Sequence, residues 1–160
     1  VFRFPDTLNS INERGTSMQI QQLSIFVENK SGRLAEITET IGKANVDIRA
    51  ISVADTSDFG ILRLIVDKPK EAVEALRAAG LTVSLTSVIA IGIDDQPGEF
   101  AKAMRVLADG NIGVEYMYAF ISRDKGKAYV ILRVQETETA VECLKNNGVT
   151  LLTAEDIYGM

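Results

Sequence analysis

The chain has 160 residues, a formal net charge of −5 and a hydrophobic fraction of 46%. Non-specific nucleic-acid affinity depends on positive charge, so this acidic balance argues against nucleic acid as a partner. No stretch reaches the roughly 20 apolar residues that a membrane span requires, so the composition predicts a soluble protein without a membrane partner.

Two residue counts restrict the chemistry further. Histidine is absent, which excludes histidine-based catalytic pairs and every metal motif that contains histidine. The single cysteine, Cys143, cannot form an internal disulfide, and no secretory segment is visible at the N-terminus. We therefore expect a cytoplasmic protein that is not an enzyme and that carries no metal or cofactor.

A regular pattern of elements begins at Met18, whereas residues 1–17 show no sustained period and are expected to form an irregular leader. Apolar residues alternate over 23–27, which predicts a strand, and then recur at helical spacing over 34–44. Pro69 and Gly80 bracket a second predicted helix. Further strands are predicted over 46–54, 59–66 and 81–87, so the order is strand, helix, strand, strand, helix, strand.

The same order restarts at residue 88 without a linker. Gly32 matches Gly98 at an offset of 66, whereas Gly80 matches Gly148 at an offset of 68, which predicts a middle turn two residues longer in the second copy. A period of this length indicates duplication of a whole small domain. The sequence predicts an α+β fold of two ferredoxin-like βαββαβ modules, residues 18–87 and 88–160, each an antiparallel sheet with helices on one face.

The turn between the first strand and the first helix occurs twice, as ENKSGRLAEI from residue 28 and DDQPGEFAKA from residue 94. A glycine lets the backbone approach a ligand, and the helix behind it offers unpaired amides and a positive dipole end to a carboxylate. Asn29 and Asp94 can accept from an ammonium group nearby. The alternative is purely structural, with Ser31 and Asp95 capping the helices.

The second of these turns resembles the ACT family of amino-acid-binding regulatory modules, with its Asp-x-Pro-Gly sequence followed by Phe100 at a leucine position. The first copy departs from the pattern at Ser31. The resemblance implies ACT-type modules that pair side by side and bind a ligand at the seam between domains. The ligand-binding residues expected on these grounds are Asn29, Ser31, Gly32, Arg33, Leu34, Asp94, Gln96, Pro97, Gly98, Glu99 and Phe100 at the turns, with Ile51, Ser52, Val53, Tyr116 and Tyr118 on strands.

The sequence thus predicts a sensor of a free amino acid, with the amino acid itself not identified, that forms a homodimer because exposed sheet edges favour association. One alternative is a regulatory subunit that controls a metabolic enzyme of amino acids in trans. A second is an RNA-recognition module, but its two signature-like fragments lie in different copies and Lys127 replaces an aromatic residue. Cys143 is expected to be a small buried hydrophobe, and Glu155 and Asp156 a polar tail.

Overall fold

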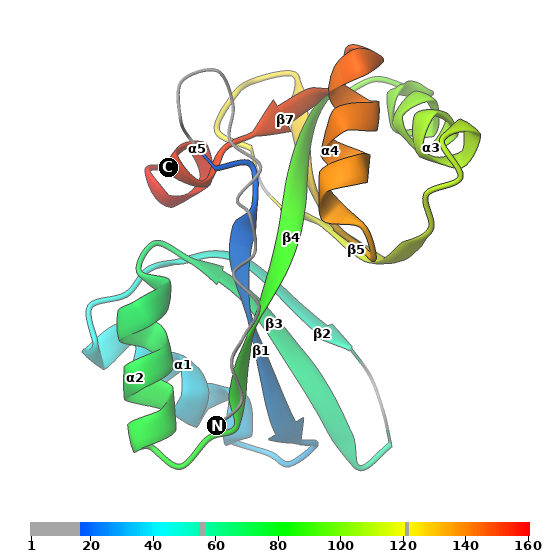
Figure 1. The fold of residues 1–160 in the computed structure, drawn as a ribbon. Coiled ribbons are helices and arrows are strands. Elements are labelled where there is room, and N and C mark those ends of the chain that lie inside the picture. The colour runs from blue at the N-terminus through cyan, green and yellow to red at the C-terminus, as the bar shows by residue number, and fades with distance from the viewer. Residues whose placement is uncertain (1–16, 55–56, 121) are drawn as a thin grey trace.

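The computed structural model describes residues 17–54, 57–120 and 122–160, so most of the predicted leader lies outside the described residues. Two βαββαβ units follow one another in the chain (Figure 1), which confirms the predicted fold class. Their elements are β1 (Ile20–Glu28), α1 (Arg33–Lys43), β2 (Ile48–Ala54), β3 (Phe59–Val66), α2 (Pro69–Ala78), β4 (Val83–Asp94), α3 (Glu99–Asp109), β5 (Val114–Phe120), β6 (Lys127–Val134), α4 (Thr137–Asn146), β7 (Thr150–Leu152) and α5 (Ala154–Tyr158).

The two modules share one strand. The strand order is β2-β3-β1-β4-β6-β5, all antiparallel, and β7 also pairs with β4. Residues 83–88 of β4 pair with β1, whereas residues 89–94 pair with β6. Figure 1 shows this long strand running from the module that contains α1 and α2 to the one that contains α3 and α4. The boundary predicted between residues 87 and 88 falls inside β4.

Strand register confirms both repeat offsets. Leu23 lies opposite Leu64 in the first module, and Ile89 lies opposite Leu132 in the second. The first members of these pairs differ by 66 positions and the second members by 68. The two extra residues fall in the middle turn, because β2 and β3 are separated by positions 55–58 and β5 and β6 by positions 121–126.

Three apolar clusters stabilise the fold. One cluster lies between the sheet of the first module and its helices, where Ile37 and Ile41 of α1 are fully buried, and the second module repeats it with Ala103 and Leu107. The third cluster joins Ile20 to residues of β4, β6, β7 and α5. Alternation along the strands places this cluster on the sheet faces that carry no α1–α4 helix, so the modules pack against each other there.

The C-terminal segment corrects one expectation from the sequence. Residues 154–158 form α5 instead of a polar tail, and Ile157 is fully buried in the cluster between the modules. Thr153 and Asp156 form a reciprocal capping box, in which each side chain accepts from the other residue's backbone amide. Asp156 is therefore a helix-capping residue.

Candidate functional site

The predicted binding turns, which we call corner 1 (residues 28–36) and corner 2 (residues 94–102), have the same backbone conformation. Gly32 immediately precedes α1 with φ 88° and ψ −16°, and Gly98 precedes α3 with φ 90° and ψ −15°. This left-handed region favours glycine. Apart from the glycine itself and its two chain neighbours, no atom of the described residues lies within 4 Å of a Cβ atom added at either glycine. Both corners are therefore open to a ligand.

Neither helix is capped by a side chain. The alternative role of Ser31 and Asp95 as helix caps is wrong, because no side chain accepts from the first amides of α1 or α3. Each corner is hydrogen-bonded to the turn between the two middle strands of its module. In corner 1 the Asn29 backbone amide donates to the Asp58 carbonyl at 2.9 Å. The Asp95 amide donates to the Gly126 carbonyl at 2.8 Å. The Arg33 and Glu99 amides already donate to the Lys30 and Gln96 carbonyls, so the amides that remain available among the described residues are those of residues 34–35 and 100–101.

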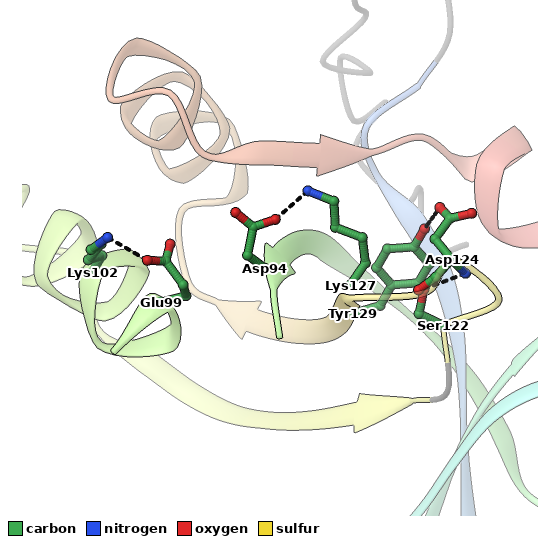
Figure 2. Close-up of polar contacts among 7 residues, drawn as sticks. All are labelled: Asp94, Glu99, Lys102, Ser122, Asp124, Lys127 and Tyr129. Carbon is green, nitrogen blue, oxygen red and sulfur yellow. Dashed lines mark hydrogen bonds and ion pairs between the residues drawn. The ribbon is translucent and has the colours of Figure 1, made fainter. Parts of the chain in front are cut away.

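The charges at the two corners are inverted. In corner 1 the Arg33 guanidinium donates to the Glu36 carboxylate, with 2.9 Å between Nη1 and Oε2. In corner 2 the same two positions hold Glu99 and Lys102, which also form an ion pair (Figure 2). A cation beside the helix N-terminus strengthens the attraction for a carboxylate, whereas Glu99 opposes it. Identical backbones therefore present different electrostatics.

Corner 2 contains a second ion pair, between Asp94 Oδ1 and Lys127 Nζ at 2.5 Å (Figure 2). The hydrogen bond from Lys127 lowers the pKa of the Asp94 carboxyl and raises the pKa of Lys127. A hollow of about 210 Å³ lies beside this corner, and both ion pairs line it. Asp94 thus lies at the corner, but its carboxylate already forms an ion pair with Lys127.

Figure 2 also shows the turn that leads into β6. The Tyr129 hydroxyl donates to Asp124 Oδ2 at 2.6 Å, and the Asp124 amide donates to the Ser122 hydroxyl at 3.0 Å. The carboxylate of Asp124 raises the pKa of Tyr129. These bonds order the chain next to Gly126, whose carbonyl accepts the hydrogen bond from the Asp95 backbone amide of corner 2.

The other predicted residues at the corners are exposed or partly exposed. Leu34 and Phe100 occupy equivalent positions at the start of α1 and α3, and their side chains are 44% and 38% exposed. The side-chain nitrogen of Asn29 (Nδ2) donates to the Ser57 carbonyl at 3.5 Å, which leaves the side-chain oxygen as an acceptor. Gln96 and Pro97 are exposed in the turn before Gly98.

The predicted strand residues are divided between two faces. Ile51 and Val53 lie opposite Leu64 and Leu62, which pack under the helices, and yet they are 52% and 50% exposed on the outer strand β2. Ser52 faces the opposite side of the sheet. Met117 occupies the equivalent outer position of β5 and is 42% exposed.

Tyr116 and Tyr118 instead contact a buried glutamine of the first module. Gln22 is fully buried, its nitrogen donates to the Tyr116 hydroxyl at 2.8 Å, and its oxygen accepts from the Tyr118 hydroxyl at 2.7 Å. The Arg63 guanidinium lies 3.7 Å from the centre of the Tyr116 ring. Burial raises the pKa of Tyr118. These tyrosines therefore join the two modules.

Sequence reasoning missed Gln22 as a partner of these tyrosines. Its equivalent in the second copy, at an offset of 66, is Val88, so one copy has a polar residue where the other has an apolar one. That mismatch was a usable signal, because a polar residue in a buried strand needs a hydrogen-bond partner.

The described residues hold no group of three or more acidic, cysteine or histidine side chains that could bind a metal, and no helix among them is long and apolar enough to cross a membrane. Cys143 is partly buried against α3, with its Sγ 3.6 Å from the Val106 carbonyl. The fold defines a pair of ferredoxin-like modules, each with a glycine corner before its first helix.

The chain belongs to a known family of this class, because the family model described as "ACT domain pair" matches residues 18–160. The structure of protein BT0572 from Bacteroides thetaiotaomicron is 40% identical, with a TM-score of 0.85, and the match covers 89% of this chain and 98% of that one. No curated protein matches the sequence.

Two solved structures are similar in fold at low identity. The ligand-free regulatory subunit of aspartate kinase from Thermus thermophilus is 15% identical, with a TM-score of 0.60 and coverage of 82% of this chain and 94% of that one. The corresponding subunit from Thermus flavus is 16% identical, with a TM-score of 0.57 and coverage of 81% and 93%. At these identities the likeness shows the fold alone.

Proposed function

We propose that this chain is a non-catalytic regulatory protein of the cytoplasm that binds a free amino acid at its corners. The observation that carries the proposal is the pair of open glycine corners, each in front of a helix without a side-chain cap. Such a corner accepts the carboxylate of a zwitterion through backbone amides. Membership of the ACT domain pair family supports a regulatory role.

Charge favours corner 1 for the carboxylate. The first position of α1 holds Arg33, paired with Glu36, whereas the first position of α3 holds Glu99, paired with Lys102, so the member of each ion pair that comes first in the helix is positive in corner 1 and negative in corner 2. Among the described residues the side-chain oxygen of Asn29 has no hydrogen-bond donor, so it can accept from the ammonium group. In corner 2 a ligand ammonium would have to compete with Lys127 for Asp94.

The outer strands support a homodimer. Ile51 and Val53 on β2 and Met117 on β5 leave apolar side chains exposed at strands that have a neighbour on one side only. Such edges associate readily, and a second copy can cover both at once. A ligand at the corners would then lie near this seam, from which its binding could be transmitted to a metabolic enzyme of amino acids in trans. The names of the aspartate kinase regulatory subunits are consistent with such a partner.

Thermal unfolding in the presence of each of the twenty free amino acids tests the proposal. At least one should raise the melting temperature, since a ligand that binds only the folded chain stabilises it. Gly32→Val and Gly98→Val should each reduce the shift, because a side chain would enter the open corner. Gly80→Val is the matched control, because Gly80 also has a positive φ (81°) and open surroundings but lies after α2. Absence of any shift, or equal loss in the control, would contradict amino-acid binding at the corners.

A further inference from the structure

The helix-free face of the first module carries an exposed aromatic pair. Phe26 of β1 and Phe59 of β3 stack with their ring centres 5.0 Å apart and their planes 19° apart, and the residues are 54% and 43% exposed. Ile61 lies opposite Phe26 in the register and is 37% exposed. We call these three residues the aromatic platform. Each ring has one face that its partner does not cover, so a further planar group can extend the stack.

Arg63 lies on the same face, two residues along β3 from Ile61. Its guanidinium carbon lies 3.7 Å from the centre of the Tyr116 ring, and this stacking holds the side chain in place. Its Nε atom is buried without a hydrogen-bond partner, and Arg63 forms no ion pair with any described residue. The partly buried Arg49 and Arg133, in contrast, each pair with a carboxylate. The positive charge of Arg63 is therefore not balanced within the described residues.

Hydroxyl groups flank Arg63 across the sheet. Ser52 on β2 and Ser24 on β1 lie opposite Arg63, and Ser84 on β4 lies opposite Ser24. Residues that lie opposite each other point to the same face, so these four residues form one row, which we call the serine row. The Ser24 hydroxyl accepts from Gln22 Nε2 at 3.1 Å, so its own proton can be donated. A guanidinium among hydroxyl donors, in a row without a carboxylate, is suited to a phosphate group.

The spacing of the two features defines the shape of the ligand. Phe26 is the next residue of β1 on this face after Ser24, and alternate residues of a strand are roughly 7 Å apart. Glu28 follows on the same face, opposite Phe59, and repels an anion from that end of the aromatic platform. A ligand that uses both features therefore has an aromatic ring at the platform and an anion at the serine row, joined by a short spacer. A nucleotide has this form, with its ribose as the spacer.

The second module has neither feature. The positions equivalent to Phe26, Phe59 and Arg63 hold Gly92, Lys127 and Ile131. The aromatic residue that an RNA-recognition module needs at position 127 is thus present only in the first copy, as Phe59. Stacking of a base on aromatic side chains of a sheet is a general mode of recognition. The net charge of −5 opposes a strand with many phosphates more than a ligand with one.

We propose that the helix-free face of the first module binds a free mononucleotide. Its base stacks on the aromatic platform, and its phosphate accepts hydrogen bonds from Arg63 and the hydroxyls of the serine row. None of these residues belongs to corner 1 or corner 2, so the proposal does not depend on amino-acid binding there.

Adenosine 5′-monophosphate (AMP) is a suitable probe, with adenosine as the ring without the anion and ribose 5-phosphate as the anion without the ring. In an NMR titration of the full chain we expect AMP to saturate, with shifts of the backbone amides of residues 24–26 and 59–63. Both comparison compounds should bind about tenfold more weakly or worse. Phe26→Ala should weaken AMP binding about tenfold. Leu85→Ala is the matched control, because Leu85 is also 43% exposed but lies on the opposite face of the sheet.

The phosphate contact is tested separately. Arg63→Gln should weaken AMP binding about tenfold or more, whereas Arg105→Gln makes the same change in charge on the exposed surface of α3 and should leave the affinity unchanged. Arg63→Gln also removes the stacking on Tyr116, so Ser52→Ala serves as a second variant that keeps that contact. It should weaken AMP binding about threefold or more.

The proposal is overturned if AMP does not saturate, if adenosine or ribose 5-phosphate binds as tightly as AMP, or if either control variant loses as much affinity as its partner. A short single-stranded oligoadenylate that binds far more tightly than AMP would also overturn it, because the ligand would then be a strand. Gly32→Val should leave AMP binding unchanged. The outcome at this face is therefore distinguishable from the outcome at the corners.

Discussion

The two modules have the same backbone and different surfaces. Corner geometry repeats to within a few degrees at Gly32 and Gly98, and the left-handed residue at the helix exit repeats as Asn45 (φ 56°) and Asn111 (φ 55°). At the same positions the side chains diverge, because Arg33 corresponds to Glu99. Duplication has thus preserved the positions that need a special backbone conformation, while charge has changed freely.

The helix-free faces differ as well. In the first module Phe26 and Phe59 stack with ring centres 5.0 Å apart and remain 54% and 43% exposed. The equivalent positions of the second module, at offsets of 66 and 68, hold Gly92 and Lys127. Each module therefore has its own chemistry, and exchanging equivalent residues is a direct way to test what each difference does.

The largest effect is expected from Gln22→Val, which gives the first module the residue that the second has at position 88. The hydroxyls of Tyr116 and Tyr118 would lose their buried partner, so the free energy of unfolding should fall by about 3 kcal/mol. Chemical denaturation measures it. The neighbouring Gln21→Val, at a partly exposed position, should change the stability by about 0.5 kcal/mol or less; similar losses in both variants would contradict a specific role for Gln22.

The next largest effect concerns ligand affinity at the corners. Arg33→Glu should weaken binding of the amino acid that stabilises the chain by about tenfold, because it replaces attraction for the carboxylate with repulsion. Glu99→Arg should strengthen binding at corner 2. Calorimetric titration of both variants checks the pair. If Arg33→Glu leaves the affinity unchanged while Gly32→Val removes binding, the carboxylate does not approach Arg33.

A smaller effect is expected from Phe59→Lys, which gives the first module the lysine of the second. The aromatic stack with Phe26 is largely exposed, so its loss should cost about 1 kcal/mol or less. Removing an exposed apolar side chain should reduce the binding of a hydrophobic dye to the folded chain. A loss of several kcal/mol would show instead that this stack is covered in solution.

The smallest effect concerns the Asp94–Lys127 pair, which the first module lacks. A carboxyl with a lowered pKa stabilises the fold above its ordinary titration range, and this contribution is lost as the pH falls through the lowered pKa. Lys127→Met should raise the Asp94 pKa toward its ordinary value, as followed by carbon NMR of the carboxyl. Lys102→Met should raise it less, because Lys102 is a weaker cause of the lowering.

Most of the fold could be predicted from the sequence because its signals are local and occur twice. The alternation of apolar and polar residues predicted the strands. The change in the repeat offset from 66 to 68 predicted the longer turn between the two middle strands of the second module. α5 was missed because five residues are too few for a helical period to appear, although Thr153 and Asp156 have the spacing of a capping box.

The site was only partly accessible to sequence reasoning. Glycine corners are readable because left-handed backbone is rarely adopted by other residues. The contacts of Tyr116 and Tyr118 with Gln22 depend on how one module packs on the other. No spacing of residues in the sequence indicates that packing. The pairing of Asp94 with Lys127 likewise depends on which residues of β4 and β6 come to lie side by side.

The strand common to both halves makes the molecule sensitive to insertions at one place. Odd-numbered residues of β4, such as Val83 and Ile89, face the helices along its whole length. One extra residue between Val88 and Ile89 would rotate one half by a full pleat relative to the other and turn apolar side chains toward water. The even spacing of 66 residues keeps the side chains of both copies in phase along β4.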